Sequence, residues 1–184
     1  MDELVDILDS EGNPTGKVLL KSEAHKKGLF HPTVHIWIYT EDGKILIQKR
    51  AANKKTYPNR WDVSVAGHIT AGEHPLSSAI REIEEEIGLS INENELEKTG
   101  IYRSSRVHSK DLIDCEFHHI YIVELKVPIE QLKIQESELA AIKLVNVDTY
   151  LSAMNDPSLL KDYVPFQSDY IELVFTAIQK KIKQ

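Results

Sequence analysis

The sequence predicts an α/β protein of the α+β or mixed layered type, in which strands surround one central helix and a second helix closes the chain. Most segments before residue 70 alternate between apolar and polar side chains, as half-buried strands do. From Pro75, and again from about Gln167, the apolar spacing changes to that of a helix. The 184 residues suffice for one hydrophobic core, and no repeat or linker marks a boundary, so we expect a single domain over residues 1–184.

The first part of the chain predicts strands joined by tight turns. A small hairpin is expected at about residues 3–20, around the turn sequence DSEGNPTG. The polar stretch KSEAHKKG is read as a loop. Residues 33–40 (TVHIWIYT) and 45–50 (ILIQKR) then predict two strands connected by an Asp-Gly turn. Residues 61–69 (WDVSVAGHI) alternate as one further strand.

A helix is predicted from Pro75 to the residue before Gly88, because proline suits a first helical turn and glycine the position after a last one. Its apolar positions are spaced 4, 3 and 4 apart: Leu76, Ile80, Ile83 and Ile87. Beyond it we expect strands at about 96–107, 114–127 and 141–147, and a terminal helix at about 167–182.

Composition excludes several classes of protein. The 22 basic and 29 acidic residues give a net charge of −7, which opposes binding to nucleic acid or to a membrane surface. The single cysteine, Cys115, cannot form an internal disulfide. The apolar runs are too short for a membrane span, and the start MDELVDILD lacks the pattern of a secretion signal, so a cytoplasmic protein is expected.

The predicted central helix carries an unusual concentration of acid. Glutamates occupy four of five consecutive positions: Glu82, Glu84, Glu85 and Glu86. Each like-charge pair one turn apart costs a helix roughly 0.2–0.5 kcal/mol, and the helix dipole disfavours anions near its C-terminal end. The plain interpretation is a solvated acidic face.

A divalent cation would reverse these costs. Carboxylates one turn apart can share Mg²⁺, which takes substrate phosphates as further ligands. Arg81 precedes Glu85 by four residues and can pair with it, and Glu73 could fold back onto the same site. Glycine at Gly67 would let the backbone bring a carbonyl near the ion.

The spacing favours the metal interpretation, because the segment resembles the box of the Nudix hydrolases at every specified position. The matching positions are Gly67, Glu73, Arg81, Glu82, Ile83, Glu85, Glu86, Gly88 and Leu89. The resemblance implies a mixed sheet sandwiched between helices, with residues 67–89 forming a loop–helix–loop. It also implies water attack on a diphosphate, typically of a nucleoside diphosphate joined to another group, with Mg²⁺ or Mn²⁺.

The resemblance further implies individual roles. Glu82, Glu85 and Glu86 would bind the metals, with the Gly67 carbonyl as an added ligand, while Arg81 and Glu73 would orient the carboxylates. The general base varies within the family. Its candidates here are Glu85 or Glu86 in the helix and Glu136 or Glu138 in the loop QESEL, where a solvated loop is the alternative.

Outside the box, the chain resembles the branch that includes type I isopentenyl-diphosphate isomerase, through AHKKGLFHPTVHIWIY, YPNRWDVSVAGH and a later acidic pair. The resemblance implies a second divalent metal, such as Zn²⁺ or Mn²⁺, held by His25, His31, His68, Asp114 and Glu116. The alternative is that these are exposed or merely hydrogen-bonded residues. Asp114, Glu116 and His118 would share one face of a strand.

One departure weighs against isomerisation. The isomerase uses a cysteine just before the first box glycine to transfer a proton, and this chain has Ala66 there. Cys115 is no replacement, because neighbouring carboxylates would raise a thiol pKa and its side chain points to the other face. The isomerase box is also degenerate, whereas this box keeps every carboxylate.

Two further segments are candidate substrate contacts. Trp61 could form an apolar wall, or simply belong to the core. The basic loop KRAANKK could meet phosphate, or be solvated, and its charged members are Lys49, Arg50, Lys54 and Lys55. His68, beside Gly67, could contact either metal or substrate.

Three functions follow as hypotheses. The first is a metal-dependent hydrolase of a small diphosphate, the second an isopentenyl-diphosphate isomerase-like enzyme, and the third a non-catalytic nucleotide-binding domain. A homodimer is a candidate assembly, through the terminal helix or the first hairpin.

Overall fold

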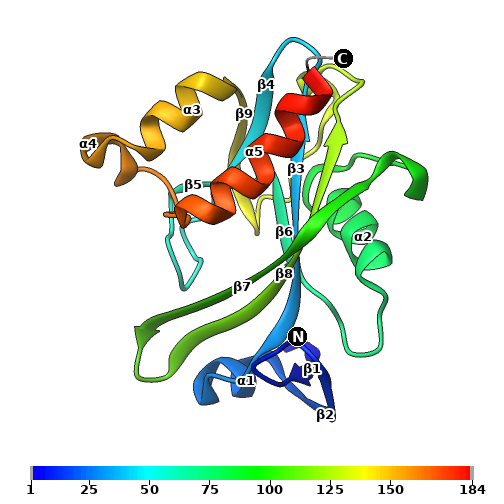
Figure 1. The fold of residues 1–184 in the computed structure, drawn as a ribbon, viewed down its shortest axis with the longest axis vertical. Coiled ribbons are helices and arrows are strands. Elements are labelled where there is room, and N and C mark those ends of the chain that lie inside the picture. The colour runs from blue at the N-terminus through cyan, green and yellow to red at the C-terminus, as the bar shows by residue number, and fades with distance from the viewer. Residues whose placement is uncertain (1, 183–184) are drawn as a thin grey trace.

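A seven-stranded mixed sheet forms the centre of the computed structural model, which describes residues 2–182 (Figure 1). Five strands run in the order β5-β4-β3-β8-β7, while β6 pairs with β3 and β9 pairs with β4. The strands of this sheet are β3 (His31–Tyr39), β4 (Lys44–Arg50), β5 (Trp61–Asp62), β6 (Val65–His68), β7 (Glu97–Ser109), β8 (Leu112–Glu124) and β9 (Leu139–Asn146). The mixed α/β class is therefore as expected.

The sheet has an apolar layer on each face. Val34, Ile36 and Ile38 of β3 pack in one cluster with Ile83 and Ile87 of helix α2 (Pro75–Ile87). On the other side, the intervening side chain Trp37 packs in a second cluster that includes helix α5 (Ser168–Ile182). Figure 1 shows α2 and α5 on opposite sides of β3 and β8. The alternation read from TVHIWIYT thus sorts its side chains between two layers.

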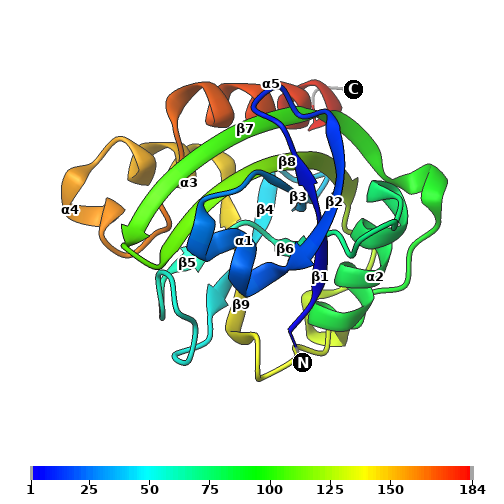
Figure 2. The ribbon, with the colours of Figure 1, turned by 90° about the horizontal axis from the view of Figure 1, so that it is seen from below.

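The N-terminal segment forms a separate small layer. Strands β1 (Leu4–Leu8) and β2 (Pro14–Leu20) pair antiparallel where the first hairpin was expected, and helix α1 (Lys21–Lys27) follows. Val5, Ile7 and Ala24 hold these elements together. They lie at the bottom of Figure 1 and in front in Figure 2, against the end of the sheet where β3 begins.

Two predictions about local structure were wrong. The stretch read as a polar loop is α1, which ends at Gly28 in the left-handed conformation, φ 60°. The alternating segment 61–69 is not one strand, because the Ser64 hydroxyl lies between β5 and β6, donates to the Leu46 carbonyl and accepts from the Ile38 amide. These side-chain bonds replace ladder bonds at that point.

The last third of the chain contains elements that the pattern did not predict. Helices α3 (Val147–Met154) and α4 (Pro157–Leu160) follow β9, and each begins after a side-chain cap, Asn146 and Asp156 respectively. The terminal helix lies where its apolar stripe placed it. Short 3₁₀ turns occupy Glu93–Glu95 and Ile129–Gln131. Within residues 2–182, every helix is too short or too polar to span a lipid bilayer.

The packing of α2 on the sheet should be measurable by mutation. Ile83 is fully buried, so we expect Ile83→Ala to lower the free energy of unfolding by about 2–5 kcal/mol in urea denaturation. Ile101 is half exposed, and Ile101→Ala, as control, should cost about 0.5 kcal/mol or less. Equal losses in the two variants would contradict this account of the core.

Candidate metal and substrate site

One large cleft, with a volume of about 930 Å³, collects most of the residues that carry chemistry. It is bounded by α1, the first halves of β3 and β8, β6, the acidic side of α2 and the loop after β4. Three box carboxylates line it, together with a histidine cluster and several cationic side chains. The box and the second candidate metal site are therefore parts of one cavity.

The three box glutamates are not equally exposed. Glu82 and Glu86 are 8% and 5% exposed, whereas the Glu85 side chain is 54% exposed. The plain interpretation of a solvated acidic face is thus wrong for two of the three. A buried carboxylate is costly unless a cation or hydrogen-bond donors compensate it.

Gly67 is required by this burial. The Glu82 carboxylate lies directly against the Gly67 α-carbon, and a methyl group there would overlap the carboxylate carbon and both oxygens. Gly67 has ordinary backbone angles, so close approach explains the glycine and a special conformation does not.

Arg81 organises the acidic side of the cleft. Its guanidinium donates to Glu73 (3.2 and 3.1 Å), to Glu82 (2.7 Å) and to Glu85 (3.2 Å). It also donates to the His68 carbonyl at 3.2 Å, which ties the helix to β6. Glu73 does fold back onto the box, as the spacing suggested.

The electrostatics of the box favour a bound cation. Burial, and then the nearby Glu82 carboxylate, raise the pKa of Glu86 well above its usual value. Burial also raises the pKa of Glu82, against the opposing effect of Arg81. Within residues 2–182, the buried Glu86 Oε2 atom has no hydrogen-bond partner. Oxygen ligands with an unpartnered atom fit a hard divalent cation.

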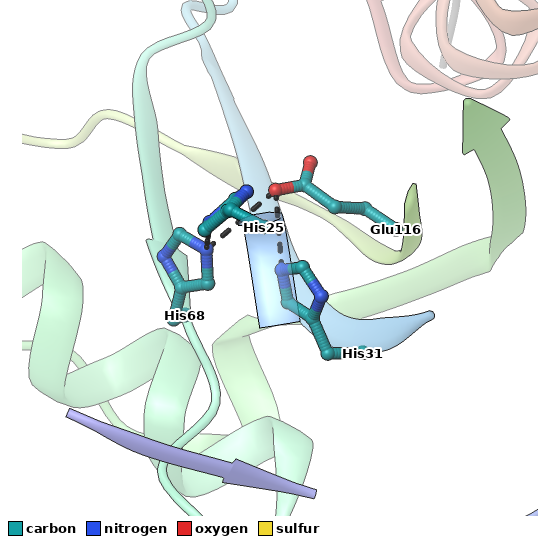
Figure 3. A group of neighbouring side chains, drawn as sticks. All are labelled: His25, His31, His68 and Glu116. Carbon is teal, nitrogen blue, oxygen red and sulfur yellow. Dashed lines mark hydrogen bonds and ion pairs between the residues drawn. The ribbon is translucent and has the colours of Figure 1, made fainter. Parts of the chain in front are cut away.

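The second cluster gathers His25, His31, His68 and Glu116, which point toward one another in Figure 3. One ligand atom from each residue lies within 4.8 Å of all the others. The His25 and His68 Nε2 atoms are 3.2 Å apart. Glu116 Oε1 is 3.6 Å from both His31 Nε2 and His68 Nε2. This donor set fits a borderline ion such as Zn²⁺ or Mn²⁺.

Strand register explains why residues so distant in sequence meet. β3 and β8 are parallel, and His31 lies opposite Glu116. On the other side of β3, His68 of β6 lies opposite Thr33. α1 then brings His25 over the end of these strands, so its expected exposure was wrong: its side chain is 12% exposed.

The surroundings prepare these groups as ligands. His31 Nδ1 lies 2.9 Å from the Leu29 carbonyl, which only a protonated Nδ1 can satisfy, so the buried Nε2 keeps its lone pair. Burial lowers the pKa of His68 and favours its neutral form. Although burial opposes it, the neighbouring imidazoles of His31, His68 and His118 hold the pKa of Glu116 well below its usual range.

Asp114 does not join the four ligand atoms, contrary to the five-residue site that the isomerase resemblance implied. Its Oδ1 atom lies 2.9 Å from His25 Nδ1, and its Oδ2 atom lies 2.7 Å from His108 Nε2. The aspartate side chain is one methylene shorter than that of glutamate, and its carboxylate lies beside Nδ1 of His25.

Cationic side chains also line the cleft. Arg50 and Lys54 of the basic loop line it, with Arg50 donating to Asp62 at 2.8 Å and Lys54 paired with Glu138. Lys55 also lines the cleft. Glu138 lies in the cleft, whereas Glu136 is exposed and does not line it.

Trp61 and Lys49 were expected to contact substrate, and the structure places both outside this cleft. They line a separate cavity of about 340 Å³ together with Lys143. The Lys143 ammonium lies 3.9 Å from the centre of the Trp61 ring and Lys49 lies 5.9 Å from it. These contacts occupy the ring that was proposed as a substrate wall.

Sequence patterns did not single out several residues of the cleft. Lys21, His35, Tyr102, Arg106, Phe166 and Tyr170 belong to this group, and His108 contacts the cleft residue Asp114. His35 and His118 stack at 4.0 Å, and burial lowers their pKa values to about 4 and about 3, so both are neutral. His31 and His35 lie on the same face of β3, and this alternation is the sequence signal that could have identified His35.

Ala66 and Cys115 lie as the sequence indicated. Ala66 lines the cleft opposite His35 in the strand register. Cys115 is buried beside Ser105, outside the residues that line the cleft.

Comparison with known proteins agrees with the geometry of the box. A family model described as NUDIX domain matches residues 29–167. This chain belongs to the Nudix family. An uncharacterised Nudix hydrolase of Clostridium acetobutylicum is 39% identical over 150 residues, which are 80% of this chain and 71% of that protein. The Nudix protein described here is thus an enzyme of the Nudix hydrolase family.

Further relatives include both branches. Isopentenyl-diphosphate Delta-isomerase of Serratia proteamaculans is 34% identical over 122 residues, 66% of each chain. Nudix hydrolase 3 of Arabidopsis thaliana is 34% identical over 171 residues, covering 90% of this chain and 22% of that protein, so the Nudix protein spans about a fifth of that relative. A solved structure from Deinococcus radiodurans matches with a TM-score of 0.66 at 17% identity, over 95% of this chain and 98% of the other, which shows the fold.

In the absence of metal, the burial of Glu86 should make the free energy of unfolding of the Nudix protein depend on pH. The native pKa of Glu86 lies above its unfolded value of about 4.5, so its contribution is favourable below pH 4.5 and is lost as pH rises toward the native pKa. In EDTA at pH 8, we expect Glu86→Gln to raise the free energy of unfolding by about 1–3 kcal/mol, measured in urea.

Glu84 provides the matched control, because it lies on the same helix and is exposed. Glu84→Gln should change stability little in EDTA. Added Mg²⁺ should stabilise the wild type and the Glu84→Gln variant more than Glu86→Gln. A Glu86→Gln variant that is less stable than Glu84→Gln in EDTA would contradict the account.

Proposed function

We propose that this enzyme hydrolyses a diphosphate linkage in a small molecule, of the nucleoside diphosphate-X type, with Mg²⁺ or Mn²⁺ bound at the box. The observation that carries the proposal is the buried pair Glu82 and Glu86, whose carboxylates face the cleft while Glu86 Oε2 lacks a partner. When bound, the ion would neutralise phosphoryl oxygens and lower the pKa of a water molecule.

The chain's own residues would fix the geometry of attack. Glu82, Glu85, Glu86 and the Gly67 carbonyl are the proposed ligands. Arg81 would hold two of these carboxylates in place, and Glu73 would hold Arg81, through the contacts described above. Such positioning matters because an in-line attack tolerates little displacement.

The cationic wall would bind the diphosphate itself. Lys21, Arg50 and Lys54 line the cleft, and all three already pair with carboxylates, namely Glu3, Asp62 and Glu138. Guanidinium groups match phosphate oxygens through paired N–H donors. These cations would therefore neutralise diphosphate oxygens in the same cleft in which the box carboxylates would hold the metal.

Glu138 is the better placed of the two loop glutamates for the role of general base. Its carboxylate lines the cleft and pairs with Lys54, so phosphate bound to Lys54 would release Glu138 to accept a proton from water. Glu136 is exposed outside the cleft. Glu85 and Glu86 remain the alternatives, although as metal ligands they would be less free to accept a proton.

A second candidate function is an isomerase-like reaction on a five-carbon diphosphate, which the His25–His31–His68–Glu116 cluster favours. That chemistry needs a proton donor and an acceptor on either side of an alkene. Ala66 supplies neither, and Cys115 is buried away from the cleft-lining residues. Hydrolysis therefore accounts for more of the site.

The purified protein should convert at least one compound in a panel of nucleoside diphosphate derivatives and isopentenyl diphosphate to monophosphate products, with Mg²⁺ or Mn²⁺. Mass spectrometry would identify the products. Glu86→Gln should lower kcat at least a hundredfold because it removes a charged metal ligand, while Glu84→Gln should retain activity.

Two other outcomes would contradict the proposal. A rearranged five-carbon diphosphate of unchanged mass, separated by chromatography and lost in His68→Gln, would establish the isomerase-like function. Tight binding of a nucleotide without turnover would establish a binding domain.

The base assignment predicts unequal effects in neighbouring loop positions. Glu138→Gln should lower kcat about 10²–10⁴-fold with little change in KM, because a general base acts in the transition state. Glu136→Gln, two residues away, should leave both constants within about twofold. Equal activity in the two variants would instead assign the role of general base to the box glutamates.

A further inference from the structure

We propose that Asp114 is not a metal ligand and that His108 and Asp114 together position His25, so that the histidine cluster binds one ion through three imidazoles and one carboxylate. This donor set would be tetrahedral and would select Zn²⁺, whereas the oxygen-only box selects Mg²⁺ or Mn²⁺. The inference rests on metal binding by the cluster, and it does not depend on which reaction the box catalyses.

The spacing of the four donor atoms supports a tetrahedral site. Ligand bonds of about 2.0–2.1 Å to zinc place neighbouring donors about 3.3–3.4 Å apart. The observed separations are 3.2 Å between the His25 and His68 nitrogens and 3.6 Å from Glu116 Oε1 to the nitrogens of His31 and His68. These three separations lie within a few tenths of an ångström of the tetrahedral value, and all four donor atoms lie within 4.8 Å of one another.

Glu116 has one oxygen available for the ion. Its Oε1 atom faces His31 and His68, while its Oε2 atom lies 3.6 Å from His118 Nδ1. The same His118 nitrogen is 2.7 Å from the Thr33 hydroxyl. Binding through Oε1 alone keeps the ligand count at four.

Both oxygens of Asp114 are already engaged by histidines. Oδ1 forms an ion-pair contact of 2.9 Å with His25 Nδ1, and Oδ2 lies 2.7 Å from His108 Nε2. A carboxylate on Nδ1 keeps the proton there and directs the Nε2 lone pair of His25 to the ion. Asp114 therefore acts through His25.

His108 is held in turn by the loop after β4. Its ring meets the Tyr57 ring edge-on, with centres 5.4 Å apart. The Tyr57 hydroxyl accepts from Arg106 Nη1 at 3.1 Å, and Arg106 also donates to the Pro165 carbonyl at 2.7 Å. Tyr57 has a left-handed backbone, φ 48°, which surrounding contacts must maintain. A chain of contacts thus runs from this loop to His25.

Metal binding tests the inference without any assay of activity. The metal-free protein would be titrated with Zn²⁺ against a chromophoric chelator, and with Co²⁺ while visible absorption is recorded. Tetrahedral Co²⁺ absorbs far more strongly than octahedral Co²⁺, so strong bands at one ion per chain are expected. X-ray absorption of the zinc form should show four nitrogen or oxygen ligands at about 2.0–2.1 Å.

The variants separate a positioning residue from a ligand. Asp114→Asn and His108→Gln should each weaken Zn²⁺ binding about 10–100-fold while keeping the strong Co²⁺ bands. Glu116→Gln removes a ligand, so it should weaken binding more and change the bands. His119→Gln is the control for loss of a histidine, since His119 follows His118 on β8 and points to the other face.

Three results would overturn the inference. Weak, octahedral Co²⁺ absorption or five to six ligands in the wild type would show that Asp114 or solvent completes the shell. Equal losses and equal spectral changes in Asp114→Asn and Glu116→Gln would make Asp114 a ligand. Absence of stoichiometric Zn²⁺ binding would remove the site altogether. Because the readout is equilibrium binding, failure of Mg²⁺-dependent hydrolysis at the box would leave these outcomes unchanged.

Discussion

The contact between the Glu82 carboxylate and the backbone of Gly67 is the constraint on which the rest of the site depends. It sets how closely α2 approaches β6, and therefore buries Glu82 and Glu86 beside the cleft. Arg81 reinforces the contact by joining the helix carboxylates to the carbonyl of His68. Burial raises the pKa of both glutamates, so the fold holds two carboxylates in a state that a cation would stabilise.

The central sheet sets the spacing of the second cluster. Parallel pairing of β3 and β8 puts His31 opposite Glu116, and antiparallel pairing of β3 and β6 puts His68 opposite Thr33. Alternate side chains of these strands share one face. Along that face, the candidate metal ligands at the strand ends are followed by neutral imidazoles, and these are followed by the apolar core. A register shift of one residue would send these ligands to the opposite face.

The cleft combines groups of opposite charge without neutralising all of them. Carboxylates of the box and Glu116 line it together with Arg50, Lys54 and Lys21, and each of these three cations is already paired with an acid. A diphosphate with its metal could exchange for these pairs at little net electrostatic cost, because it presents both signs of charge. The net charge of −7 is therefore compatible with an anionic substrate, although it opposes binding to polyanions.

The sequence by itself determined the box, the helix that carries it and most of the strands, because helical periodicity, strand alternation and a fixed glycine–glutamate spacing are local properties of the chain. The resemblance to the isomerase branch also indicated that His25, His31, His68 and Glu116 meet, whereas tertiary structure decided which glutamates are buried and that Trp61 faces a different cavity. Tertiary structure also directs the Asp114 carboxylate toward His25 and His108. This orientation depends on both the length of the side chain and the pairing of the strands. Such choices depend on contacts between distant segments, and no spacing along the chain encodes them.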